Sequence, residues 1–140
     1  MPKISNPLDV RNKAAIEKAN PLYDRINRVW TKTEEFFRSK GILAPVEFTY
    51  DCDDHIEYLF GLQKVSGKWR VCNGYVEHQR PDQDAVWTVI TDCPVEERVQ
   101  LLKYVPRLFE ELVKTNEAVV PALEKAANEA EETLRKLGLE

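Results

Sequence analysis

Strict alternation of apolar and polar residues in the middle of the chain constrains the fold more than any other feature. It runs over residues 46–50 and again over residues 56–62. Ser66 and Gly67 then form a two-residue hairpin signal, and apolar side chains alternate again over residues 69–75. A period of two is typical of a β-strand with one buried face. The pattern therefore predicts an antiparallel sheet.

The turn at Ser66 and Gly67 also predicts which residues pair. Counting back from it, Tyr58 faces Tyr75 and His55 faces His78. A three-residue loop over residues 52–54 would set the first strand against the second, with Phe48 facing Tyr58. Both hairpins then place their aromatic residues on one face, and a slip of one residue would break that agreement.

A fourth strand is expected over residues 85–91, so residues 44–91 are predicted to form a four-stranded antiparallel β-meander. Helices are expected on both sides of it. Cap-then-proline pairs at Asn6-Pro7 and Asn20-Pro21 predict two helices, or one kinked helix, over residues 7–40. Residues 94–138 are predicted to be helical, with Pro106 and Pro121 kinking or restarting the helix.

These elements predict a single α+β domain, residues 1–140, with the N-terminal helices and the long C-terminal helix on one face of the sheet. Such helices outgrow the sheet, because a continuous 45-residue helix would run about 68 Å and a seven-residue strand only about 23 Å. The far C-terminal turns must fold back on residues 7–20 or contact another chain. We expect a homodimer whose interface includes four apolar residues, Val119, Val120, Leu123 and Leu134.

Two rows of charge accompany these helices. The basic row, Arg11, Lys18, Arg25 and Lys32, and the acidic row, Glu110, Glu117, Glu124 and Glu131, each have a spacing of seven residues. Such rows flank the apolar seam in coiled coils, and they also occur on helix faces that are simply solvated. Both interpretations stand at this point.

Composition excludes several classes of function. The chain has 140 residues and a formal net charge of −4, which does not favour nucleic-acid binding, and no apolar stretch is long enough to span a membrane. The first twelve residues lack the apolar core of a signal peptide. Three cysteines, without a Cys-x-x-Cys pair, suggest reduced thiols and a cytoplasmic protein.

The richest polar cluster lies at the predicted hairpin end. His55 and His78 face each other there, and Asp53 and Glu57 are close in sequence, which is a set that could ligate a divalent metal or supply a general base. A solvated turn rich in aspartate is the alternative. A zinc set of Cys52, His55, Cys72 and His78 is not favoured, because Cys72 and His78 would be about 20 Å apart along one strand.

Other chemistry has little support in the sequence. Neither a nucleophile elbow nor a glycine-rich phosphate loop is present, so no catalytic residue and no cofactor are predicted. Gly61 and Gly74 fall on neighbouring strands, on the face opposite the aromatic residues. There they would let another backbone or a flat ligand approach, or they are merely tolerated in a half-exposed sheet.

The size, acidity and helix–sheet–helix order resemble those of the class I type III secretion chaperones, which are dimeric effector-binding proteins. The resemblance covers the layout of most of the chain and no specific motif. Four consecutive strands without an inserted helix depart from that family's arrangement, as does the proline-broken C-terminal helix.

We therefore expect a non-enzymatic, dimeric protein-interaction module of the adaptor, chaperone or inhibitor type. The alternatives are a small metal-dependent or acid–base enzyme using His55 and His78, and small-ligand binding at the face bearing Gly61 and Gly74.

Overall fold

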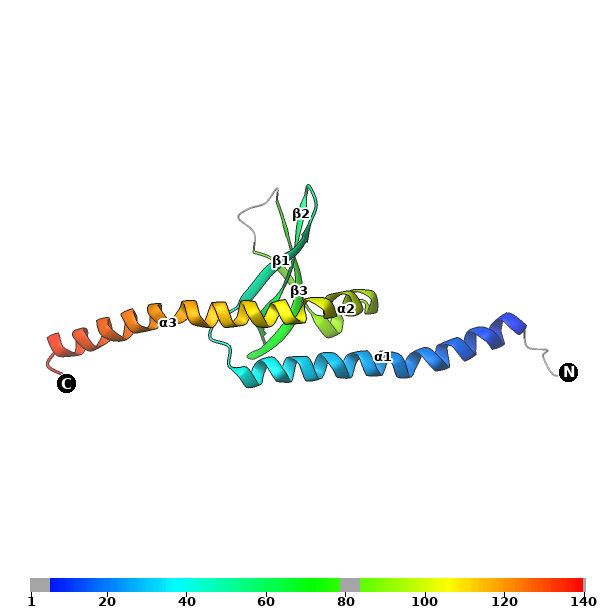
Figure 1. Ribbon diagram of the computed structural model, residues 1–140, viewed down its shortest axis with the longest axis horizontal. Helices are drawn as coiled ribbons and strands as arrows, with labels where there is room; N and C mark the ends of the chain where they lie inside the picture. Colours follow the sequence, from blue (N-terminus) through cyan, green and yellow to red (C-terminus); the bar gives the residue numbers. More distant parts are fainter. Residues whose placement is uncertain (1–5, 79–83, 140) are drawn as a thin grey trace.

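The chain folds into a four-stranded antiparallel sheet that a long helix precedes and a long helix follows in sequence, as predicted for an α+β protein, and both helices lie on the same side of the sheet (Figure 1). The structure is a computed structural model that describes residues 6–78 and 84–139. The strands follow one another across the sheet in the order β1-β2-β3-β4. The elements are α1 (Pro7–Lys40), β1 (Val46–Cys52), β2 (Ile56–Val65), β3 (Lys68–Glu77), β4 (Val86–Val89), η1 (Ile90–Asp92), α2 (Val95–Leu101), η2 (Leu102–Tyr104) and α3 (Val105–Lys136).

The predicted pairing of β2 with β3 is confirmed. Tyr58 pairs with Tyr75, and the backbone N–H of His78 donates to the carbonyl oxygen of His55 at 2.8 Å. Ser66 (φ 51°) and Gly67 (φ 82°) both have positive φ, which is the backbone of a tight two-residue hairpin turn. The turn residues thus fix the register of the central hairpin.

Two predictions about the outer strands are wrong. Phe48 pairs with Phe60 instead of Tyr58. The loop between β1 and β2 is longer than predicted, since Cys52 pairs with Glu57, and the register then shifts by one residue at a bulge between Thr49 and Asp51. The observed pairing of Phe48 differs from the predicted one by two residues in total, so the aromatic face is kept. The fourth strand, expected over residues 85–91, covers only Val86–Val89, since the chain turns into the short helix η1 at Ile90.

The structure has helices in both of the predicted ranges, residues 7–40 and 94–138, and shows how each range is divided. Helix α1 is one continuous helix with Pro21 inside it, so it is not divided into two. The side chain of Asn6 accepts the N–H of Leu8 at 2.8 Å and caps its first turn. The C-terminal segment divides at one of the two predicted places, because α3 begins with Pro106 in its first turn, whereas Pro121 lies inside α3 and does not divide it.

The core lies between the aromatic face of the sheet and the middle of the two long helices. The ring of Trp30 meets Phe60 edge-on with 6.1 Å between centroids, and Phe60 meets Phe48 at 6.0 Å. Helices α1 and α3 run side by side here, with 5.3 Å between the rings of Phe36 and Phe109. The buried core residues are Trp30, Phe37, Val46, Phe48, Phe60, Leu62, Val71, Ile90, Cys93, Leu101, Leu108 and Leu112.

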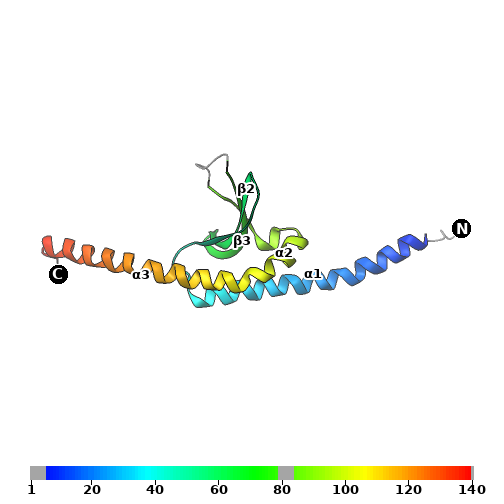
Figure 2. The ribbon, with the colours of Figure 1, turned by 45° about the horizontal axis from the view of Figure 1, so that its top comes forward.

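Both long helices extend far beyond this core, in opposite directions (Figures 1 and 2). Among residues 6–25 only Ala19 is half-buried, and among residues 117–139 only Val119 is; every other side chain in these ranges is exposed. We call residues 7–25 the N-terminal arm and residues 117–136 the C-terminal arm. The C-terminal arm therefore does not fold back on residues 7–20, which was one of the two predicted alternatives.

Candidate functional site

The polar cluster predicted at the hairpin end has its backbone placed as expected. Asp53 accepts the N–H groups of His55 at 2.8 Å and of Ile56 at 2.7 Å through one carboxylate oxygen. These two bonds lower the pKa of the Asp53 carboxyl below its usual value. The carboxylate is thus used by the turn itself. Glu57 accepts the hydroxyl of Thr49, so it too has a structural partner.

The structure does not assemble these residues into a metal site. Within residues 6–78 and 84–139, no group of three or more histidine, cysteine, aspartate or glutamate side chains could hold a metal ion. His55 and His78 are both exposed at the far end of the sheet. The metal hypothesis for His55, His78, Asp53 and Glu57 therefore rests on the paired histidine backbones alone.

The face bearing Gly61 and Gly74 is covered by a side chain of this chain. A methyl group added at Gly74 would lie 2.6 Å from Cε3 of Trp87, and one added at Gly61 would lie 3.2 Å from Cη2 of the same indole. The added methyl at Gly61 would also overlap the carbonyl oxygen of Val46. The flat group that these glycines admit is thus the indole of Trp87 in β4.

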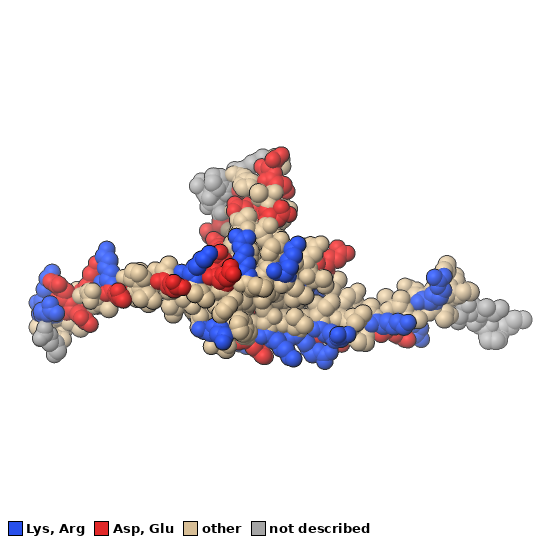
Figure 3. Space-filling view, in the orientation of Figure 1, with Lys and Arg blue, Asp and Glu red and all other residues tan. Residues whose placement is uncertain are grey.

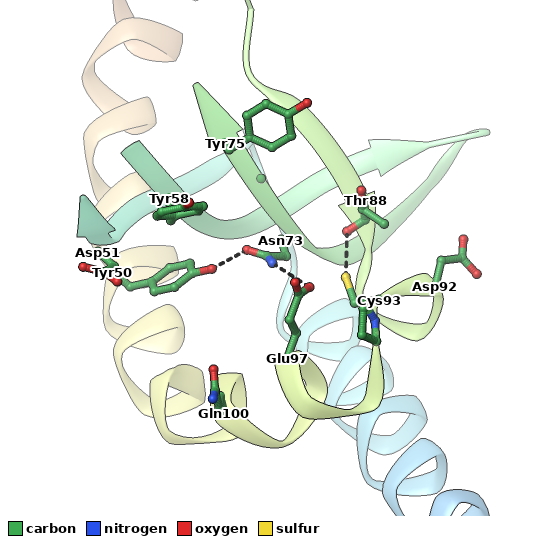
Figure 4. A pocket seen from close by; sticks show the side chains of 12 residues that line it. Tyr50, Asp51, Tyr58, Asn73, Tyr75, Thr88, Asp92, Cys93, Glu97 and Gln100 are labelled. Carbon is green, nitrogen blue, oxygen red and sulfur yellow. Dashed lines mark hydrogen bonds between the residues drawn. The ribbon is translucent and has the colours of Figure 1, made fainter. Parts of the chain in front are cut away.

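A pocket of about 500 Å³ opens between the sheet and α2, and residues of both line it (Figure 4). Tyr50, Tyr58 and Tyr75 contribute aromatic rings to its wall, from three different strands. The hydroxyl of Tyr50 donates to Oδ1 of Asn73 at 2.7 Å, and Nδ2 of Asn73 donates to a carboxylate oxygen of Glu97 at 3.2 Å. This chain of bonds ties the sheet to α2 and shapes the pocket.

The pocket is acidic. Asp51, Asp92 and Glu97 are among its lining residues, whereas no lysine or arginine of residues 6–78 and 84–139 lines it. Burial raises the pKa of Tyr50 to about 12, and the nearby carboxylate of Glu97 adds to the rise. Tyr50 is therefore neutral at physiological pH and acts as a hydrogen-bond donor. The arrangement suits a ligand that is positively charged and partly apolar.

One residue in the sequence, Asn73, could have indicated this pocket. Asn73 shares the face of β3 with Val71 and Tyr75, so the alternation puts a polar amide on a face that is otherwise apolar. A buried amide needs hydrogen-bond partners. Glu97 lies 24 residues away in sequence, and its contribution becomes visible only when α2 packs at the edge of the sheet.

The two arms form the other candidate surface. Of the four predicted interface residues, Val120, Leu123 and Leu134 are 45%, 54% and 46% exposed, and Val119 is half-buried. Leu8 and Leu22 of the N-terminal arm are 65% and 50% exposed. Figure 3 shows lysine and arginine side chains along the lower edge of the molecule, over α1, and acidic side chains at the far end of the sheet. Apolar side chains this exposed along two helices are typical of a protein–protein interface.

None of the helices formed by residues 6–78 and 84–139 combines the length and the apolarity needed to cross a membrane. Comparison of the chain with protein-family models, with curated proteins and with solved structures gave no match in any of the three. The resemblance to class I type III secretion chaperones therefore stays a likeness of layout and supports nothing below.

Proposed function

We propose that the chain is a non-enzymatic protein-interaction module that works as a homodimer, as an adaptor, chaperone or inhibitor does. The sheet and the middle of the helices share one packed core, which we call the body, and the two arms are its binding elements. We place the protein in the cytoplasm, because its three cysteines form no disulfide, which suits a reducing compartment.

The observation that carries this proposal is the mismatch between helix length and sheet length. Helix α1 has 34 residues and α3 has 32, whereas the longest strands have ten. At 1.5 Å per residue the helices are about 50 Å long, and the longest strands span about 33 Å. A helix in a protein gains most of its stability from packing an apolar face against other elements. Arms with exposed apolar rows are therefore most stable when another helix covers them.

Sedimentation equilibrium of the full chain between about 1 and 100 μM tests the proposal. We expect a dimer of twice the 16.2 kDa chain mass. Leu123→Asp should weaken it, because the aspartate places a charge in the apolar row. Asn128→Asp is the matched control, since it adds the same charge to an exposed polar position of the same arm. A wild-type chain that stays at 16.2 kDa throughout would rule out the homodimer.

A second candidate function, binding of a small organic cation, is favoured by the acidic, tyrosine-walled pocket. An alkylammonium or guanidinium group could stack on the tyrosine rings while the carboxylate of Glu97 balances its charge. Calorimetric titration with agmatine tests this. We expect Glu97→Gln to weaken binding, and Glu96→Gln, a change on the same short helix outside the pocket, to leave it unaltered. Equal affinity in both variants would exclude the pocket as the site.

A further inference from the structure

The charges of the two arms have opposite sign. The N-terminal arm carries four basic and three acidic residues, whereas the C-terminal arm carries three basic and five acidic residues. The regularly spaced rows continue into the arms, where Arg11, Lys18 and Arg25 belong to the N-terminal arm. Glu117, Glu124 and Glu131 are their counterparts in the C-terminal arm. The arms are thus complementary in charge as well as alike in having exposed apolar rows.

None of these six side chains forms an ion pair with another residue that the structure describes. All six of these side chains are exposed. The helix ion pairs found within the described residues use other acidic residues, such as Glu129 with Lys125 and Glu132 with Lys136. Pairing two N-terminal arms, or two C-terminal arms, would bring like charges together, which is destabilising. Pairing an N-terminal arm with a C-terminal arm brings opposite charges together.

The N-terminal arm also has an apolar groove at its base. The groove has a volume of about 640 Å³ and is lined by Leu22, Ile26 and Val29 of α1 and by Leu102 of η2. Arg25, Arg28 and Lys32 line it as well. An apolar floor with a basic rim suits a helix that has an apolar row beside an acidic one. The C-terminal arm is such a helix.

The direction of the arms decides how copies can combine. Helices α1 and α3 run the same way and overlap only in the middle, so their arms leave from opposite ends of the body (Figures 1 and 2). Asn116 of α3 holds this arrangement by accepting the N–H of Leu43 and donating to the carbonyl oxygen of Gly41, each at 3.0 Å. A two-fold axis perpendicular to the helices exchanges the two ends. It therefore places each N-terminal arm against a C-terminal arm.

We propose that two copies of this chain form a closed dimer in which the C-terminal arm of each packs antiparallel on the N-terminal arm and its groove on the other. This inference rests on the proposed function and specifies its interface. The two-fold axis makes the same contact twice, so both arms of both copies are covered and no apolar arm is left exposed to bind a third copy. Opposite charges select this pairing over the two like-with-like pairings.

Charge exchange tests the interface. The first variant carries Arg11→Glu, Lys18→Glu and Arg25→Glu, the second carries Glu117→Lys, Glu124→Lys and Glu131→Lys, and the third carries all six substitutions. Every change is at an exposed position, and circular dichroism checks that the helices persist. Dissociation constants come from sedimentation at low salt, because exposed charges are screened as ionic strength rises.

The proposed pairing gives a specific set of results. The first and second variants should each dimerise at least about tenfold more weakly than the wild type, because every arm contact becomes repulsive. The six-fold variant should recover wild-type affinity. An equimolar mixture of the first two variants should also recover it, as a mixed dimer, because each acidic arm then meets a basic one.

Other results would overturn the inference and leave the proposed function distinguishable from it. A wild-type dimer whose affinity is the same in all three variants would keep the module dimeric but exclude arm-to-arm charge pairing. Growth of the wild type beyond a dimer at high concentration would exclude the closed two-fold arrangement in favour of an open chain. A monomeric wild type would remove both the interface and the homodimer.

Discussion

The carboxylate of Glu34, in α1, lies 2.6 Å from Nε of Arg70, in β3, and its side chain is only 4% exposed. The contact is bidentate, since Nη2 of Arg70 donates to the second carboxylate oxygen at 3.3 Å. The backbone N–H of Val71 also donates to Glu34, at 3.2 Å. This buried ion pair fixes α1 on the sheet, and with it the direction in which the N-terminal arm leaves the body.

Removing either partner should destabilise the fold, but unequally. Arg70→Met leaves a buried carboxylate with one backbone partner, and we expect a loss of about 3–5 kcal/mol in unfolding free energy. Glu34→Gln should cost less, because Arg70 is 29% exposed and can still be hydrated. Urea denaturation of both variants measures the difference. Equal losses would mean that the pair acts as a packing contact instead of a charge pair.

The turn chemistry and the alternation predicted the sheet well, because both are local. Ser66 and Gly67 fix the central register by themselves, so the pairing of Tyr58 with Tyr75 follows from counting. The bulge between Thr49 and Asp51 was not predicted, since the alternation over residues 46–50 runs without a break up to it. Tyr75 was expected to be buried and is 40% exposed, because the helices do not reach its end of the sheet.

The helix faces were harder to predict because both sides of α1 carry apolar residues. The row with a spacing of seven that includes Leu22, Val29 and Phe36 is 41–50% exposed at those positions. Trp30 and Phe37, one position further along, are fully buried against the sheet. A carboxylate, Glu34, lies on that buried face, and only the position of Arg70 in the sheet explains why.

Trp87 should make the two glycines of its face respond differently to substitution. Gly74→Ala puts a methyl group against the indole, and we expect a loss of about 1–3 kcal/mol from overpacking. In a Trp87→Ala background the same change should cost little, because the indole that it displaces is gone. A double-mutant cycle by thermal or urea unfolding gives this coupling.

Gly61→Ala is the control for that cycle. Its methyl group would overlap the backbone carbonyl of Val46, so removing the Trp87 ring should not rescue it. Rescue of both glycine variants by Trp87→Ala would show that the backbone of β1 moves to accommodate the methyl group at residue 61. The absence of any coupling between Gly74 and Trp87 would contradict the packing described here.

The three thiols should differ sharply in reactivity. Cys52 is exposed, whereas Cys72 and Cys93 are buried. Burial raises the pKa of Cys72 to about 11 and that of Cys93 to about 12, so neither is a thiolate at pH 8. Ellman's reagent at pH 8 should therefore react with one thiol per folded chain, and with none after Cys52→Ser. Rapid reaction of a second thiol would contradict this burial.

The same two thiols predict a loss of stability in alkali. An unfolded cysteine ionises near pH 8.5, and the folded ones only near pH 11–12, so the unfolded state loses its protons first. Their contribution is fully present below about pH 8.5 and is lost as pH rises towards 12. Cys93→Ala should make the urea midpoint fall less steeply between pH 8 and 10.5 than in the wild type, whereas Cys52→Ser should not change the slope.

The histidine pair at the sheet end offers the last test, by calorimetric titration of the full chain with zinc and with manganese. We expect no binding tighter than millimolar, because Asp53 and Glu57 already have hydrogen-bond partners in the turn and the strand. His78→Ala should change the unfolding free energy by no more than about 0.5 kcal/mol, as exposed substitutions usually do. Micromolar zinc binding that disappears in His78→Ala would instead favour the alternative of a metal-dependent enzyme over the interaction module.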